Sequence, residues 1–170
     1  MPNQSPKNRM EKMSPFKILI GLGLMCWSTL VFGFRRGWVK REDIFDYALN
    51  QLVSSSHASN ENVAIIAGAE DLSDDELIGL ILTLESTNNA SDLDKWRLGF
   101  LLWIEASDGS DKEKINLLQK AYADFDYPED MSSCSVYSQD EISPLLAMSD
   151  VAAALKERFL LGRSGADHVL

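Results

Sequence analysis

The chain has 170 residues, of which 45% are hydrophobic and 25% charged, so it suits one folded domain and excludes a mainly disordered protein. Its net charge of −10 is unevenly distributed: residues 1–41 hold eight Lys or Arg against one acid, and the rest holds eight against 25. An acidic body repels phosphate backbones, which argues against nucleic-acid binding and favours a basic protein partner. The alternative is that the acidity only keeps the domain in solution.

The sequence contains no motif that signals catalysis or cofactor binding. It has no Gly-rich phosphate loop, no paired-histidine helix and no Cys-x-x-Cys, and we interpret His57 and His168 as surface residues. The two cysteines, Cys26 and Cys134, form no disulfide framework and fit a reducing cytoplasm. We therefore expect a cytoplasmic protein that is not an enzyme, with no cofactor and no small-molecule substrate.

The beginning of the chain contains one ambiguous apolar run. Residues 1–14 are polar and basic and predict a disordered tail, followed by a single helical domain over 15–162 and a frayed tail over 163–170. The run 16–34 has nearly the length of a membrane anchor, but it contains Lys17. Ser28 is suited to cap a new helix. We favour two short buried helices that meet at Ser28, with a membrane anchor as the alternative.

Apolar residues then recur at helical spacing in block after block. A helix follows Trp38 with acids in its first turn, a serine-rich loop and a short segment 61–69 come next, and a capping box of Ser73 and Glu76 opens a helix over 74–85. The pattern also predicts a left-handed Gly37 and three further helices: 92–106 capped by Ser91, 111–124 with a capping box of Ser110 and Glu113, and 149–161 beginning at Ser149. No stretch alternates like a strand. The predicted fold is all-α, with antiparallel helix pairs in a bundle or short superhelix.

The segment 123–130 concentrates four carboxylates in seven residues. They could ligate a hard cation, and a metal-dependent enzyme built on Asp124 and Asp126 is one reading, but the spacing is not that of a calcium loop. A structural turn is another reading: Pro128 stops the helix while Phe125 and Tyr127 anchor its exit in the core. The third is a partner-binding surface made of Asp124, Asp126, Glu129, Asp130, Tyr137, Asp140 and Glu141. We predict no metal site and no catalytic residue.

Two stretches together resemble a known bacterial family. They are Trp27-Ser28-x-Leu30-x-Phe32-Gly33-Phe34-x-x-Gly37-Trp38, continuing to Tyr47-Ala48, and Lys95-Trp96-Arg97-x-x-Phe100-Leu101-Leu102-Trp103, continuing to Tyr122–Glu129. Their order and spacing are similar to the family called domain of unknown function 2247, over roughly 16–160. After Asp130 the chain departs from the more apolar continuation of that family.

The resemblance implies a soluble domain and a protein-binding role, since some members of the family resemble immunity proteins of contact-dependent growth-inhibition systems. The resulting hypothesis is an immunity protein that binds a cognate toxin domain, for example a nuclease, and blocks its active or substrate-binding surface. The alternative is a membrane-anchored acidic interaction domain that uses residues 16–34.

Overall fold

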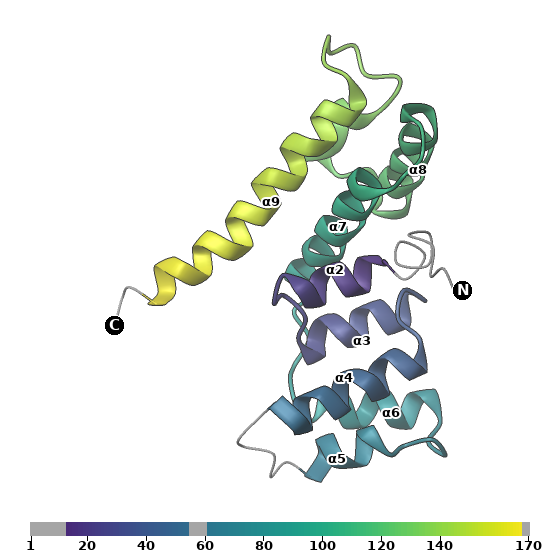
Figure 1. The fold of residues 1–170 in the computed structure, drawn as a ribbon, viewed down its shortest axis with the longest axis vertical. Coiled ribbons are helices and arrows are strands. Elements are labelled where there is room, and N and C mark those ends of the chain that lie inside the picture. The colour runs from purple at the N-terminus through teal and green to yellow at the C-terminus, as the bar shows by residue number, and fades with distance from the viewer. Residues whose placement is uncertain (1–12, 55–60, 168–170) are drawn as a thin grey trace, which may run out of the picture. The chain divides into compact units, whose positions relative to one another are not determined.

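A computed structural model describes residues 13–54 and 61–167, with side chains to residue 161. Within these ranges the chain is all-α, as predicted, and forms no strand (Figure 1). Residues 1–12 of the tail predicted over 1–14, the loop with His57, and His168 lie outside the described residues, whereas Ser14 is the N-cap of the first described helix. The elements are α2 (Pro15–Gly21), α3 (Trp27–Arg35), α4 (Arg41–Ser54), α5 (Glu61–Ala67), α6 (Asp74–Leu82), α7 (Asn89–Ala106), α8 (Asp111–Asp124), the 3-10 helix η1 (Glu129–Cys134) and α9 (Pro144–Asp167).

The helices gather into two compact units. The first unit comprises the chain up to Leu24 together with Asp94–Leu170, and the second comprises Met25–Leu93. Helix α7 contributes its first residues to the second unit and the remainder to the first. In the second unit α4 packs on α5, α5 on α6, and α3 on α6; in the first, α8, η1 and α9 contact one another.

The apolar run 16–34 forms two short helices, α2 and α3, as expected. The boundary differs: Cys26, not Ser28, is the N-cap of α3, and Ser28 lies in the first turn with its side chain buried. Gly37 adopts the predicted left-handed conformation, and the N–H of Trp38 donates back to the carbonyl of Gly33 to close the helix end. Among the described residues, no helix combines the length and apolarity needed to cross a bilayer.

A buried polar cluster joins α3 to α7 within the second unit. Cys26 makes no side-chain cap, so the carboxylate of Glu85 accepts the free N–H of Ser28 at 2.9 Å. The buried carboxylate of Asp92 accepts the hydroxyl protons of Ser28 and Thr29, the latter at 2.8 Å. Each buried polar side chain thus has a partner, which is what burial requires.

Aromatic and charged contacts complete the second unit around its aliphatic core. The ring of Tyr47 meets Trp27 edge-on at 4.8 Å, and its hydroxyl donates to the carbonyl of Met25. Burial raises the pKa of Tyr47 to about 12, with Cys26 and Glu85 adding to the effect. The phenol therefore remains protonated at neutral pH. Arg41 fixes the start of α6 in two ways: it forms an ion pair with Asp74, and its guanidinium donates a hydrogen bond to the carbonyl of Leu72.

The first unit is built on the apolar face of α7. Trp96 is fully buried and Trp103 is half-buried. Gly99 allows α2 to approach closely, because a Cβ there would lie 3.1 Å from both Leu19 Cγ and the carbonyl oxygen of Pro15. The other fully buried side chains of this unit include Leu98, Leu101, Ile104, Leu118 and Met131.

Of three helix starts predicted from serine caps, the start of α8 is confirmed, whereas α7 and α9 begin earlier than predicted. Ser110 accepts the N–H of Glu113 as predicted. Helix α7 begins earlier than predicted: Asn88, rather than Ser91, is the cap, and its side-chain oxygen accepts the N–H of Ser91. Helix α9 also begins earlier, at Pro144, so Ser149 lies inside the helix and donates instead to Glu105. The sequence contains several serines that can cap, and local spacing chose the wrong residue for α7 and α9 but the right one for α8.

The substitution Asp92→Ala should lower the free energy of unfolding by about 3 kcal/mol, because it leaves the buried hydroxyls of Ser28 and Thr29 without their acceptor. Urea unfolding followed by tryptophan fluorescence measures this loss. Asp46→Ala removes an exposed carboxylate of the same unit and should change stability by less than about 0.5 kcal/mol. Equal effects of the two substitutions would contradict the role given to Asp92.

Candidate protein-binding surface

The seven residues predicted to bind a partner all lie in the first unit, on elements adjacent in sequence. Asp124 ends α8, Glu129 and Asp130 begin η1, and Tyr137, Asp140 and Glu141 lie on the loop before α9. This stretch is entirely free of positive side chains: no Lys or Arg occurs between Lys120 and Lys156, against seven acids. The electrostatic potential along this stretch is therefore negative. The stretch runs through α8, η1 and α9, which contact one another.

The exit from α8 holds two consecutive residues in the left-handed conformation. Asp126 has φ 61° and Tyr127 φ 53°, and the N–H of Tyr127 donates to the carbonyl of Tyr122 at 2.8 Å. The same hydrogen-bond pattern closes α3, where Gly37 occupies the left-handed position. Non-glycine residues are disfavoured there. Two such residues in a row make the α8 exit a candidate functional feature.

Tyr127 corrects one prediction from the sequence. Phe125 does anchor the exit, since it is buried with its ring 5.6 Å from that of Phe100. Tyr127 is not in the core: 62% of it is exposed, and its ring rests edge-on against Tyr122 at 5.1 Å. The left-handed backbone turns the side chain away from the direction that sequence spacing suggested. An aromatic ring is thus presented to solvent beside Asp126.

Asp130 is tied to the interior of the unit. Both of its carboxylate oxygens accept from the guanidinium of Arg97, at 2.6 and 2.7 Å, and Arg97 is only 5% exposed. Asp94 also accepts from Arg97 and from Arg158 of α9. This chain of ion pairs connects α7, η1 and α9. The charge of Asp130 is therefore paired with Arg97 although half of its side chain is exposed, whereas Glu129 forms no ion pair among the described residues.

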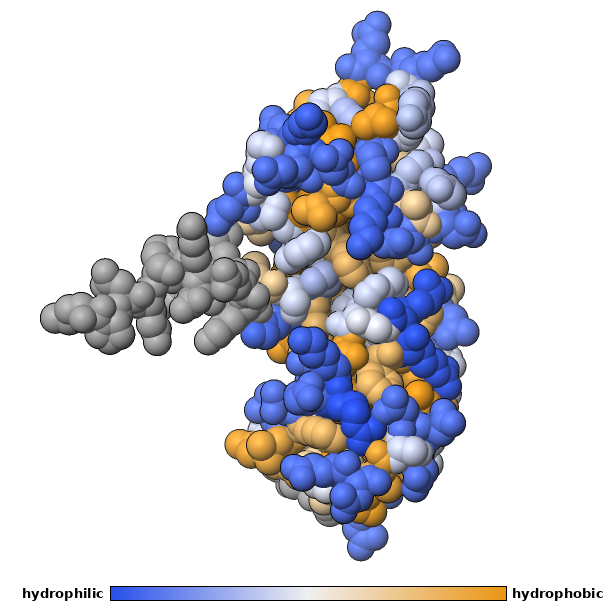
Figure 2. Space-filling model, turned by 90° about the vertical axis from the view of Figure 1, so that its right-hand side faces the viewer, coloured by the Kyte–Doolittle hydropathy of each residue, from blue (hydrophilic) through white to orange (hydrophobic). Residues whose placement is uncertain are grey.

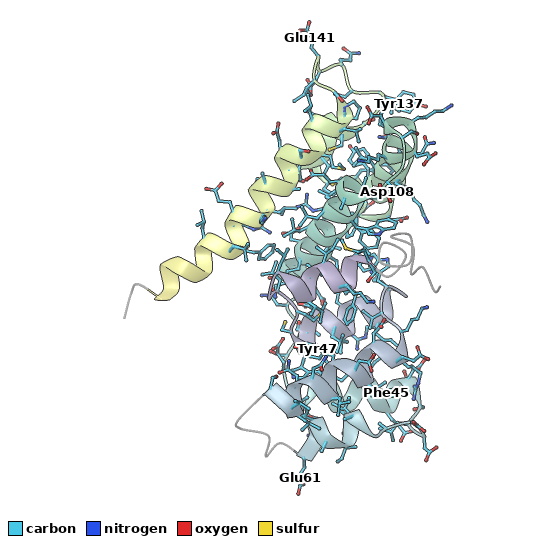
Figure 3. All side chains as sticks on the ribbon, viewed as in Figure 1. Phe45, Tyr47, Glu61, Asp108, Tyr137 and Glu141 are labelled. Carbon is cyan, nitrogen blue, oxygen red and sulfur yellow. The ribbon has the colours of Figure 1, made fainter. Side chains whose placement is uncertain are left out.

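The loop after η1 is also fixed by side-chain hydrogen bonds. Gln119 of α8 donates to the carbonyl of Cys134 and accepts the N–H of Val136. Ser133 donates to Asp140, which ties the loop back to η1. Tyr137 is 90% exposed, and Figure 3 shows it and Glu141 at the same end of the unit, both directed outward. We call Tyr127 and the seven predicted residues together the acid–tyrosine surface.

Aliphatic side chains are exposed next to these acids. Val136, Ile142 and Leu146 are all at least one-third exposed. Figure 2 shows apolar groups separated by hydrophilic side chains over the face that it presents. Apolar and aromatic groups interleaved with charge are typical of protein interfaces. The sequence prediction chose the carboxylates and Tyr137, but it placed Tyr127 in the core and did not include these aliphatic side chains.

Cys134 is buried at the end of η1. Burial raises the pKa of Cys134 to about 11, the nearby Asp130 adds to the rise and Arg97 opposes it, so the thiol is protonated and a poor nucleophile at neutral pH. Within residues 13–54 and 61–161, no three His, Cys, Asp or Glu side chains are placed to hold a metal ion.

The comparison with protein families decides the family. Residues 16–160 match the family described as an uncharacterized protein conserved in bacteria, DUF2247. The chain belongs to this family. The match covers both units and every residue of the acid–tyrosine surface. No significant match was found among curated proteins or among solved structures.

The substitution Asp130→Asn should lower the free energy of unfolding by about 2 kcal/mol, because it leaves the buried Arg97 guanidinium with a weakened partner. Glu129→Gln removes the neighbouring exposed carboxylate and should change it by less than about 0.5 kcal/mol. Chemical denaturation of both variants checks the difference. A neutral effect of Asp130→Asn would show that Arg97 does not hold η1.

Proposed function

We propose that this DUF2247 protein is a cytoplasmic immunity protein that binds a cognate bacterial toxin domain and blocks its active or substrate-binding surface without catalysis. The observation that carries the proposal is the acid–tyrosine surface: carboxylates and two exposed tyrosines on a stretch of chain that has no Lys or Arg between Lys120 and Lys156. A nuclease toxin would present a basic surface for nucleic acid, and this surface would complement it in charge.

The tyrosines distinguish this surface from an ordinary solvated acidic face. Protein interfaces are enriched in aromatic side chains, and tyrosines often carry much of the binding energy. Tyr127 and Tyr137 are both exposed, and each lies on backbone held by hydrogen bonds. Ordering such side chains on binding costs little entropy because the supporting backbone is already fixed. The carboxylates would speed encounter, while the rings would slow dissociation.

The second unit has another cluster of acidic side chains, around the start of α6, which is the alternative surface for binding a basic partner. Glu70, Asp71, Asp75 and Glu76 are all exposed there, and no Lys or Arg occurs between Arg41 and Lys95. These acids have an evident local role, since Asp74, Asp75 and Glu76 lie in the first turn of α6 and complement its dipole. The exposed aromatics that favour the acid–tyrosine surface have no counterpart among them.

Co-expression with the product of the neighbouring upstream gene, or with its C-terminal domain alone, tests the function. The full chain should co-purify with that product in a stoichiometric complex and should abolish its toxicity. Protection without a complex, or a complex without protection, would contradict inhibition by direct binding.

The location of the interface is tested by reversing the charges of Glu129 and Glu141, neither of which makes an ion pair among the described residues. The double variant Glu129→Lys, Glu141→Lys should weaken toxin binding by about tenfold or more and reduce its dependence on salt. Tyr137→Ala should weaken binding by a similar factor, about 1.4 kcal/mol, with little change in salt dependence. Isothermal titration calorimetry at several salt concentrations measures both.

Glu70→Lys with Asp71→Lys is the matched control, because it changes the net charge equally on the other unit. It should leave the affinity within about threefold, through long-range steering alone. If the control weakens binding and the Glu129, Glu141 variant does not, the interface lies on the second unit and the acid–tyrosine surface is excluded.

A further inference from the structure

The second unit contains an open cavity of about 440 Å³ at the meeting of α3 and α7. It is lined by Phe32, Arg35 and Arg36 from the end of α3 and by Asn89, Ala90 and Leu93 from the start of α7. Cavities that bind small molecules measure roughly 300–1,000 Å³, so this one has the size for a small ligand and not for a folded partner. Two arginines here contrast with the strongly acidic composition of the chain.

Arg36 is held in place by two aromatic rings. Its guanidinium carbon lies 5.1 Å from the ring centroid of Phe32 and 5.6 Å from that of Trp38. Stacking on rings fixes the plane of a guanidinium but leaves its N–H donors available. Neither Arg35 nor Arg36 forms an ion pair with any carboxylate in the described part of the chain. Both positive charges are therefore available to a ligand.

The start of α7, which also lines the cavity, has backbone donors without helical acceptors. Asn89 and Ala90 are the first two helical residues, so their N–H groups have no acceptor within the helix. Asn88, the cap, accepts instead from Ser91. The buried carboxylate of Asp92 faces Ser28 and Thr29 and accepts the N–H of Asn88, not those of Asn89 or Ala90. The cavity thus combines guanidinium donors with free amide donors.

We propose that this cavity binds a phosphorylated small molecule of about mononucleotide size. The phosphate would accept from Arg35, Arg36 and the free N–H groups of Asn89 and Ala90, since paired guanidinium donors match the geometry of a phosphate. The apolar part of the ligand would lie against Phe32 and Leu93. This site is independent of the acid–tyrosine surface, which belongs to the other unit.

The test uses the full chain and a panel of AMP, GMP, CMP and UMP in isothermal titration calorimetry, with inorganic phosphate and the unphosphorylated nucleosides alongside. At least one mononucleotide should bind, at least about tenfold more tightly than its nucleoside and than inorganic phosphate. Arg35→Gln and Arg36→Gln should each weaken that binding by about tenfold or more, because each removes a charged donor.

Lys40→Gln is the matched control: it removes an exposed positive charge of the same unit that does not line the cavity, and it should weaken binding by less than about threefold. Circular dichroism and thermal unfolding confirm that each variant is folded. Equal affinity for nucleotide and nucleoside, equal effects of all three substitutions, or no mononucleotide binding at millimolar concentration would each overturn the proposal.

Discussion

A buried charge needs a partner. Helix α7 carries two buried charged side chains, and each of the two units depends on one of them. Asp92 and Arg97 are the two buried residues among the Asp, Glu, Lys and Arg that the structure describes, and they lie five positions apart on one helix. In the second unit Asp92 accepts hydrogen bonds from the hydroxyls of Ser28 and Thr29. In the first unit Arg97 forms ion pairs with Asp94 and Asp130. No buried side-chain polar atom in the described residues is left unsatisfied. Apolar packing stabilises both units, but the buried polar interactions of Asp92 and Arg97 determine which segments contact each other.

The Arg97 network is also what gives the candidate binding surface its fixed form. Asp130 anchors η1 to α7, the backbone bonds at the α8 exit set Tyr127, and Gln119 holds the loop that carries Tyr137. A surface whose backbone is already ordered loses little entropy on binding. Asp130 is therefore better understood as a support than as a contact, and Glu129, its neighbour, as the side chain available to a partner.

Much of the helical pattern was predictable from the sequence, but the buried hydrogen bonds and ion pairs between distant segments were not. Apolar spacing located the helices, and the capping box of Ser73 and Glu76 formed as expected, because these signals depend on neighbours within one turn. Asp92 and Ser28 are 64 residues apart and Arg97 and Asp130 are 33 apart, so no local rule pairs them. The exposure of Tyr127 follows from a left-handed backbone that only the three-dimensional exit of α8 reveals. The acids of the surface and Tyr137 were predicted, while the exposure of Tyr127 and of the aliphatic side chains was not.

The central claim is that the acid–tyrosine surface is where this protein meets another protein. Hydrogen–deuterium exchange of the full chain, alone and in complex with its toxin domain, tests this most directly. The account predicts that slowed exchange concentrates in residues 124–143, with the acidic start of α6 unchanged. Slowed exchange at residues 70–76 with none at 124–143 would contradict it.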